Sequence, residues 1–309
     1  MQVMSQSLRG TICTLAGAVL WGCSGACGQY VFTNYGVDSG WLTAVRMLGA
    51  GIVLTLFILI KQPGKAAGIW KVKGDALQVV IFAVFGLLFC QYSYLTAISY
   101  SNAGTATVLQ YLGPVLIMVL VCAFSRRFPT LRETAAVILA VLGTFFLATH
   151  GNPANMILTK QGLAWGLISA VSLACYTMLP AKIIPRWGSL VVTGYGMLIG
   201  GVVLAAFLNM RRLFVPLDAK GWLAVGGVVI LGTLVAYTLY LQGVGDIGPV
   251  KASMLASVEP VAATFLSVFW LGSSFELMDL AGFACIMATV FLLTQHRDGK
   301  EHEAGSSSR

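Results

Sequence analysis

The sequence predicts an all-α membrane protein with ten transmembrane helices, arranged as two inverted five-helix repeats with both chain ends in the cytoplasm. Three observations predict this class. Hydrophobic residues make up 58% of the 309-residue chain and charged residues 10%, whereas soluble domains carry about 25% charged residues. Apolar stretches long enough to cross a bilayer occur ten times. Motifs of the first half of the chain also recur in the second half.

A helix needs roughly 20 apolar residues to cross the hydrocarbon core, because no water is present there to satisfy the backbone. Hydropathy and turn signals place such helices near residues 10–33, 40–61, 75–98, 103–124, 131–149, 161–184, 189–209, 220–243, 249–271 and 276–294. The first lacks a small-residue cleavage site, so we interpret it as a span and not as a signal peptide. No soluble domain remains, and the polar segment 296–309 is predicted to be a disordered cytoplasmic tail.

The distribution of lysine and arginine predicts the orientation, since short cytoplasmic loops are enriched in both. With the N-terminus inside, the cytoplasmic cations are Arg9, Lys61, Lys65, Lys71, Lys73, Arg126, Arg127, Arg132, Lys182, Arg186, Arg297, Lys300 and Arg309. Those outside are Lys160, Arg211, Arg212 and Lys220. Most of the net charge of +8 comes from this asymmetry, so nothing indicates a nucleic-acid-binding surface.

The composition also indicates which chemistry to exclude. The seven cysteines all fall within predicted spans without the spacing of a zinc site, so we expect them to be packing residues and expect no metal ligands. No Walker loop or Rossmann glycine pattern occurs, so we expect no cofactor and no ATP-driven activity from this chain alone.

An internal repeat divides the chain into segments 1–150 and 151–295. An offset of 146 residues pairs Gly86, Tyr94, Leu109 and Pro114 with Gly232, Tyr240, Leu255 and Pro260. Offsets of 152 and 150 relate the first two predicted helices to the sixth and seventh. Five helices per copy would insert the second copy upside down. Inverted repeats place a binding site near the midplane and permit alternating access, which is the design of a carrier.

These residues also resemble a known family. Trp21-Gly22, Arg46 within AVRMLGAG, YLTAISYSNAGTATVLQYLGPV and YLQGVGDIGPVKASMLASVEPV are similar to motifs of the drug/metabolite transporter superfamily, in particular its EamA-type ten-helix members. The resemblance covers roughly residues 10–294 and implies the ten-helix carrier fold. Family members often carry an acidic residue just after the fourth and ninth helices, where this chain has Arg126 and Ser273.

Ser24 lies in a G-x-S-G sequence like that around the nucleophile of rhomboid-type intramembrane proteases. A serine nucleophile needs a general base within hydrogen-bond reach. The three histidines, His150, His296 and His302, all lie outside the predicted spans. An intramembrane hydrolase is therefore the disfavoured alternative. We interpret the motif as packing, because a small-x-x-x-small stripe lets helices approach closely and is formed here by Ala18, Gly22 and Ala26.

Glu259 is the one carboxylate predicted near the bilayer midplane. Intramembrane acids are costly and usually mark a substrate or proton path, so Glu259 is a candidate for substrate binding and coupling. The structural alternative is that Glu259, when protonated, bonds to the backbone carbonyl that Pro260 leaves without a donor. The sequence leaves both interpretations open.

Two cations are candidate gating or coupling residues. Arg46 lies some six residues into the second helix and could clamp an anion or tie that helix to nearby carbonyls; because the resemblance places an arginine there across many substrates, the tie is favoured. Lys251 follows Pro249 at a helix N-terminus, where a cation opposes the helix dipole.

Polar and aromatic side chains deep inside predicted spans are the remaining substrate-binding candidates. Interfacial belts do not explain them, whereas a water-filled cavity with aromatic walls would. Together with Glu259, the set is Trp21, Gln91, Tyr94, Gln110, Tyr176, Tyr237 and Tyr240.

We therefore expect a non-enzymatic secondary carrier in a bacterial plasma membrane. The resemblance implies export of a small organic metabolite such as an amino acid, by proton exchange or facilitated diffusion. An importer of an organic anion, clamped by Arg46 and Lys251, is the alternative within this class. The expected partners are the solute and the lipid bilayer. The coupling ion, protons included, and the oligomeric state, a homo-oligomer included, stay open.

Overall fold

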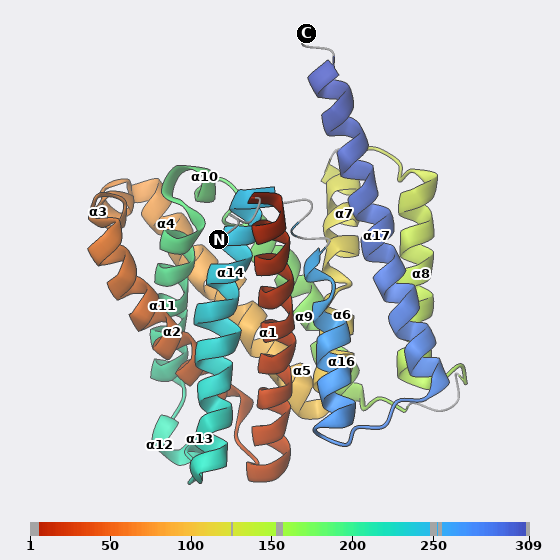
Figure 1. Ribbon diagram of the computed structural model, residues 1–309, viewed down its shortest axis with the longest axis horizontal. Coiled ribbons are helices and arrows are strands. Elements are labelled where there is room, and N and C mark those ends of the chain that lie inside the picture. The colour runs from red at the N-terminus through yellow and green to blue at the C-terminus, as the bar shows by residue number, and fades with distance from the viewer. Residues whose placement is uncertain (1–5, 125, 153–156, 248–251, 253–254, 307–309) are drawn as a thin grey trace, which may run out of the picture.

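A computed structural model describes residues 6–124, 126–152, 157–247, 252 and 255–306, with the backbone alone at 121, 245 and 293–306. All regular secondary structure in these ranges is helical, in agreement with the predicted all-α class. The long helices run between the two ends of the molecule, where the connections gather (Figure 1).

The first half of the chain forms the helices of the first predicted repeat. In order they are α1 (Gln6–Tyr35), α2 (Ser39–Lys61), α3 (Pro63–Lys71), α4 (Lys73–Ile81), η1 (Phe82–Leu88), α5 (Phe89–Tyr100), α6 (Ala103–Gln110), α7 (Gly113–Phe124) and α8 (Leu131–Thr149). Local capping fixes several starts: Asp38, Asn102 and Thr130 each accept a backbone N–H of the following helix, and Thr130 forms a capping box with Glu133.

The second half repeats this order. Its elements are α9 (Lys160–Met178), α10 (Ile184–Trp187), α11 (Ser189–Phe207), α12 (Met210–Leu213), α13 (Ala219–Gly226), η2 (Gly227–Val235), α14 (Ala236–Ile247), α16 (Glu259–Phe269) and α17 (Leu277–Ser306). In both halves, a π-helical segment with its wider i→i+5 turn interrupts an otherwise continuous helix, as η1 between α4 and α5 and as η2 between α13 and α14.

Each of the ten predicted segments contains helix, but fewer meet the length and apolarity of a membrane span. Among the described residues seven do: Gln6–Tyr35, Ser39–Lys61, Lys73–Tyr100, Ala103–Phe124, Leu131–Thr149, Ser189–Phe207 and Ala219–Val244. Two further apolar stretches are shorter: Glu259–Phe269, which is α16, and Leu277–Leu292, which is the apolar part of α17. The ninth predicted span is broken at residues 257–258, and α9 is diluted by glycine, alanine and serine, which explains why they fall outside the seven.

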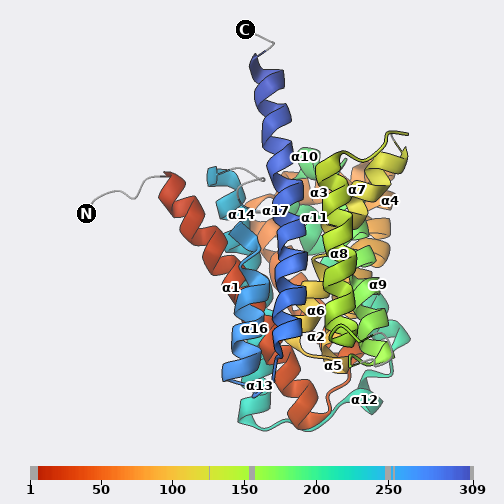
Figure 2. The ribbon, with the colours of Figure 1, turned by 90° about the vertical axis from the view of Figure 1, so that its right-hand side faces the viewer.

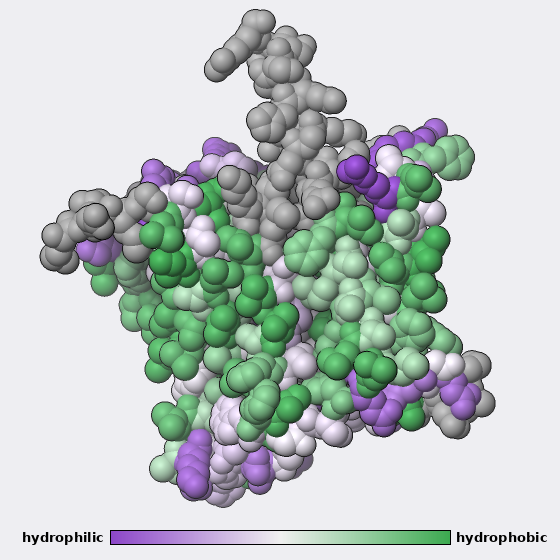
Figure 3. Space-filling view, turned by 45° about the vertical axis from the view of Figure 1, so that its right-hand side comes forward, coloured by the Kyte–Doolittle hydropathy of each residue, from purple (hydrophilic) through white to green (hydrophobic). Residues whose placement is uncertain are grey.

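The surface of the bundle has the pattern of a membrane protein. On the face shown in Figure 3, hydrophobic residues cover a broad band across the middle, and hydrophilic residues gather at both ends. Many large apolar side chains of the protein are well exposed, among them Phe85 at 65%, Val261 at 62% and Leu223 at 78%. Contiguous apolar exposure of this kind fits contact with lipid.

Long-range packing joins helices of one half to helices of the other. α2 packs along α11, and α8 along α17 (Figure 2). α1 packs on α14 and α16, just as α9 packs on α5 and α6. At the α2–α11 crossing, a Cβ atom on Gly51 would come within 2.5 Å of the backbone N of Leu198, so only glycine permits this approach.

The two chain ends lie on the same side of the molecule. α1 begins, and α17 ends, at the end of the bundle that also carries α3 and α10, whereas α12 and α13 lie at the opposite end (Figures 1 and 2). α17 continues to Ser306, whereas the disorder expected for segment 296–309 stays a prediction. Glutamate, lysine and alanine in this segment are good helix formers and extend the helix beyond its apolar part.

Candidate functional site

Two helix breaks at equivalent positions lie at the centre of the candidate site. A turn at residues 111–112 separates α6 from α7, and a turn at 257–258 precedes α16. Pro114 and Pro260 follow these turns and lack the N–H that a continuous helix would need. The offset of 146 residues that relates the sequence motifs also relates the two breaks. α6 packs against α16, so the broken helices contact each other.

The backbone carbonyl exposed by Pro260 is satisfied from the other half of the chain. Ala256 lies four residues before Pro260, and the Tyr111 hydroxyl donates to its carbonyl oxygen at 2.9 Å. A bond from Glu259 to this carbonyl was one of the two interpretations left open above; here the donor is a tyrosine 145 residues away. The Tyr111 oxygen also lies 3.2 Å from Glu259 Oε2, which brings the carboxyl group into the same cluster.

Glu259 occupies the first turn of α16, where a carboxylate is favoured by the helix dipole. It is partly buried and lies within electrostatic range of side chains from several helices, namely Arg46, Cys90, Tyr94, Tyr111, Tyr237 and Tyr240. None of the ion pairs within 4.0 Å that join described residues involves Glu259 or Arg46. The interior therefore holds an acid and a base that are near each other without being paired.

Arg46 is 5% exposed and connects α2 to the π segment η2. Its Nε donates to Thr233 Oγ1 at 2.9 Å, and its Nη2 lies 3.4 Å from the Gly232 carbonyl oxygen. Thr233 in turn donates to the Val228 carbonyl at 3.1 Å, five residues before it. The contacts join α2 to the widened turn of η2, a partner that the sequence did not predict. Both interpretations of Arg46, the anion clamp and the tie to carbonyls, stay predictions.

The aromatic candidates form a wall beside η2. The ring of Trp21 packs on Tyr237 at 5.2 Å and on Tyr240 at 5.0 Å between centroids. Tyr176, on α9, lies within electrostatic range of Tyr237. Tyr176 packs on Phe82 of η1 at 5.7 Å, which extends the wall to the other π segment. These contacts bring four predicted residues from α1, α9 and α14 together.

The candidates on α5 and α6 form a second group. The Tyr94 hydroxyl shares a 2.7 Å hydrogen bond with Thr107, and Gln110 Nε2 lies 3.7 Å from Cys90 Sγ. Tyr94 and Gln91 are 7% and 6% exposed. Tyr94 therefore has an internal partner for its polar atom and packs as a core residue. Lys251 lies outside the described residues.

Ser24 is buried against η2. Its Oγ has no hydrogen-bond partner among the described residues, so no general base is positioned to activate it. Ala18 and Ala26 are fully buried, and a Cβ atom on Gly22 would come within 2.8 Å of the Ala263 backbone N of α16. The G-x-S-G sequence thus serves close helix packing.

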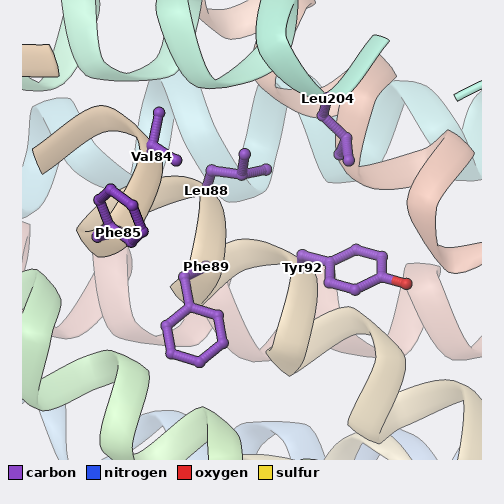
Figure 4. A pocket seen from close by; sticks show the side chains of 6 residues that line it. All are labelled: Val84, Phe85, Leu88, Phe89, Tyr92 and Leu204. Atoms are coloured by element: carbon purple, nitrogen blue, oxygen red, sulfur yellow. The ribbon is translucent and has the colours of Figure 1, made fainter. Parts of the chain in front are cut away.

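Two pockets of about 410 Å³ each are present, and Glu259 lines neither of them. One is lined by Trp41, Met210, Arg211 and Phe214. The other lies between η1–α5 and α11 and is lined by Val84, Phe85, Leu88, Phe89, Tyr92 and Leu204 (Figure 4). The predicted substrate-binding residues line neither of them.

Comparison with known proteins identifies the family. The EamA-like transporter family matches the chain twice, over residues 8–149 and 160–295. The chain belongs to this family. The EamA match agrees with the resemblance read from the sequence motifs, and it covers both halves of the chain.

Individual relatives agree with this assignment. The chain is similar to the uncharacterized inner membrane transporter YicL of Salmonella typhimurium, with 37% identity over 94% of this chain and 97% of the relative. It is also similar to the uncharacterized transporter YcbK of Bacillus subtilis, with 23% identity over 90% of each chain. A solved structure described as "Crystal structure of protein" shares the fold at a TM-score of 0.59 and 18% identity, covering 92% of this chain and 96% of the other. The EamA-like protein is thus a multi-pass membrane transporter.

Tyr111 and Thr233 are the residues of this site that sequence analysis missed. A signal for Tyr111 existed, because it lies three residues before Pro114 at the position equivalent to the second helix break. No such signal existed for Thr233, because its role depends on a π-helical turn that the sequence does not predict.

Proposed function

We propose that this EamA-like protein is a secondary carrier that exports a small zwitterionic metabolite, such as an amino acid, from a bacterial cell by alternating access. Transport would proceed by exchange with protons or by facilitated diffusion down the gradient of the solute. The observation that carries this proposal is the presence of Arg46 and Glu259 in the interior, within electrostatic range but not joined as an ion pair. Unpaired buried charges are costly, so they are usually retained for a ligand.

A zwitterion matches this arrangement of charges. Its carboxylate would approach Arg46, and its ammonium group would approach Glu259. The aromatic wall formed by Trp21, Tyr237 and Tyr240 supports the same choice, because aromatic faces attract cations and accommodate apolar side chains.

Similarities between the two halves support the proposed inverted repeat and, through it, alternating access. Equivalent π segments, equivalent helix breaks and reciprocal packing of α1 with α14 and of α5 with α9 relate the two halves. Two similar halves of opposite orientation can exchange conformations, which would open the centre to each side in turn. We propose ten spans with both ends in the cytoplasm, in which the broken α16, the apolar part of α17 and α9 complete the set.

Transport into and out of proteoliposomes tests the proposal. Vesicles containing the full-length protein and loaded with a mixture of L-amino acids should release at least one component faster than protein-free vesicles. Arg46→Gln and Glu259→Gln should each lower this rate about 10-fold or more, because each removes a charged partner of the solute. Arg211→Gln and Glu276→Gln, at exposed positions, are the matched controls and should retain wild-type rates.

The outcome also separates the alternatives. Release of organic anions alone, with dependence on Arg46 but not on Glu259, would favour the organic-anion carrier. Absence of release across amino acids, amines and organic acids would contradict the carrier proposal.

A further inference from the structure

The Tyr111 hydroxyl lies between two acceptors that belong to different parts of one helix break. On one side is the Ala256 carbonyl oxygen at 2.9 Å, and on the other is Glu259 Oε2 at 3.2 Å. A phenol has one proton to donate, while its oxygen can accept a bond from another donor. The two contacts therefore cannot both be donations from Tyr111.

The protonation state of Glu259 decides how the three groups are satisfied. When Glu259 carries a proton, its hydroxyl donates to the Tyr111 oxygen, and Tyr111 donates to Ala256, so every group has a partner. When Glu259 is ionised, Tyr111 faces two acceptors. A hydrogen bond to a carboxylate is about twice as strong as one to a neutral carbonyl, so the Tyr111 O–H turns from the Ala256 carbonyl to the Glu259 carboxylate while the proton stays on Tyr111. The Ala256 carbonyl then loses the donor that replaces the missing N–H of Pro260.

We propose that Tyr111 is a positioning residue that couples proton binding at Glu259 to the helix break at residues 257–258. Protonation closes the chain of bonds from Glu259 through Tyr111 to Ala256 and holds the break in the described geometry. Ionisation releases the Ala256 carbonyl and loosens the break. Because Tyr111 itself lies in the break of the other repeat, the same proton affects both broken helices.

Other groups that face Glu259 do not compete for this role. Those within electrostatic range are Arg46 from α2, Cys90 and Tyr94 from α5, and Tyr237 and Tyr240 from α14. Arg46 bonds to Thr233 and Tyr94 to Thr107, and the ring of Tyr237 packs on Trp21. Among the hydrogen bonds that join described residues, the one at Glu259 comes from Tyr111.

The coupling deepens the carrier proposal and rests on it for its use in transport, but it can be measured without a substrate. Infrared difference spectra of the full-length protein in phosphatidylethanolamine–phosphatidylglycerol liposomes, titrated with pH, report the carbonyl stretch of protonated carboxyl groups. Glu259→Gln identifies the band of Glu259 by removing it. Tyr111→Phe should raise the frequency of this band, because the carboxyl group loses its hydrogen-bond acceptor, and should displace the titration midpoint by about half a pH unit or more.

Tyr94→Phe is the matched control, since Tyr94 is a buried tyrosine near Glu259 whose hydroxyl bonds to Thr107 instead. It should leave the Glu259 band unchanged. A Tyr111→Phe spectrum identical to that of the wild type would overturn the proposal. If Tyr111→Phe does not fold, Glu259→Asp is the second variant, because it keeps the tyrosine and shortens the acid by one methylene. The carboxyl band of this variant should then lie at the frequency of a carboxyl group that has no hydrogen bond to a phenol. A band at the wild-type frequency would count against the coupling.

Hydrogen–deuterium exchange over residues 255–265 measures the break itself. After correction for the intrinsic effect of pH, exchange in the wild type should increase on ionisation of Glu259, and Tyr111→Phe should abolish this response. A response that persists in Tyr111→Phe would overturn the coupling. Intact coupling in a protein that transports none of the tested solutes would instead count against the carrier proposal alone.

Discussion

At the scale of single residues, surroundings decide what a chemically capable side chain does. Ser24 has the sequence context of a nucleophile but lies against the backbone of η2 without a hydrogen-bond partner among the described residues. Arg46 has the charge of an anion clamp, yet two of its nitrogens already contact Thr233 and Gly232. Its remaining capacity, together with the unpaired charge of Glu259, is what the proposed solute would use.

Ser24 provides a direct test at this scale. Ser24→Ala removes a buried hydroxyl without a partner, so we expect transport at the wild-type rate and stability unchanged or higher by up to about 1 kcal/mol. Thermal unfolding in detergent and proteoliposome release measure the two quantities. Gly232→Ala, on the facing helix, should lower stability by about 1–3 kcal/mol, because its added Cβ would collide with the Ser24 side chain. Complete loss of activity in Ser24→Ala would restore the nucleophile hypothesis.

At the scale of elements, a histidine joins the end of α8 to the start of α17. His150 caps α8 in the left-handed conformation, with φ of 49°. Its Nδ1 lies 3.1 Å from Glu276 Oε2, and its Nε2 lies 2.9 Å from Asp279 Oδ1. Both ring nitrogens can donate only in the protonated imidazolium. Partial burial lowers the pKa of His150, but the hydrogen bond to Asp279 and the charges of both carboxylates outweigh it, so the pKa lies above the ordinary 6.5.

This junction should make stability depend on pH. A raised pKa in the folded state means that the stabilisation is fully present below about pH 6.5 and is lost as pH rises through the folded-state value. The unfolding temperature of the wild type should therefore fall between about pH 6 and pH 9 by more than that of His150→Gln. Glu276→Gln, which removes the more exposed carboxylate, should show an intermediate slope. Equal slopes in wild type and His150→Gln would contradict the expectation.

The elements also indicate where sequence reasoning succeeds and where it ends. Hydropathy predicted ten segments, and each of them contains helix. It succeeds because a membrane span must present apolar side chains to lipid and satisfy its backbone hydrogen bonds internally, which requires long apolar helical stretches. Paired residues such as Pro114 and Pro260 indicated equivalent positions, and the structure has equivalent breaks there. The π turns, the Tyr111 bond to Ala256 and the Arg46 bond to Thr233 could not be predicted, since each depends on which helices become neighbours.

At the scale of the whole molecule, the segregation of the ends yields a prediction about the orientation. Gly64 in α3 and Lys220 in α13 are exposed at opposite ends of the bundle. In a background without native cysteines, Lys220→Cys should react with a membrane-impermeant maleimide in intact cells, and Gly64→Cys only after lysis. The cysteine distribution predicted above permits such a background, because the cysteines at described positions are free. Labelling of Gly64→Cys but not Lys220→Cys in intact cells would reverse the predicted orientation.

The π segments also restrict which insertions and deletions the sequence can accept during evolution. One residue added to a helical turn rotates everything that follows by about 100°. Gln91 and Tyr94 come shortly after η1, and Tyr237 and Tyr240 shortly after η2. The angular phase of these side chains is thus set by the number of residues in each segment, and only secondarily by their identity. A one-residue insertion or deletion in η2 would turn Tyr237 and Tyr240 out of the aromatic wall toward the acyl chains. Many point substitutions in η2 would instead leave both side chains facing inward.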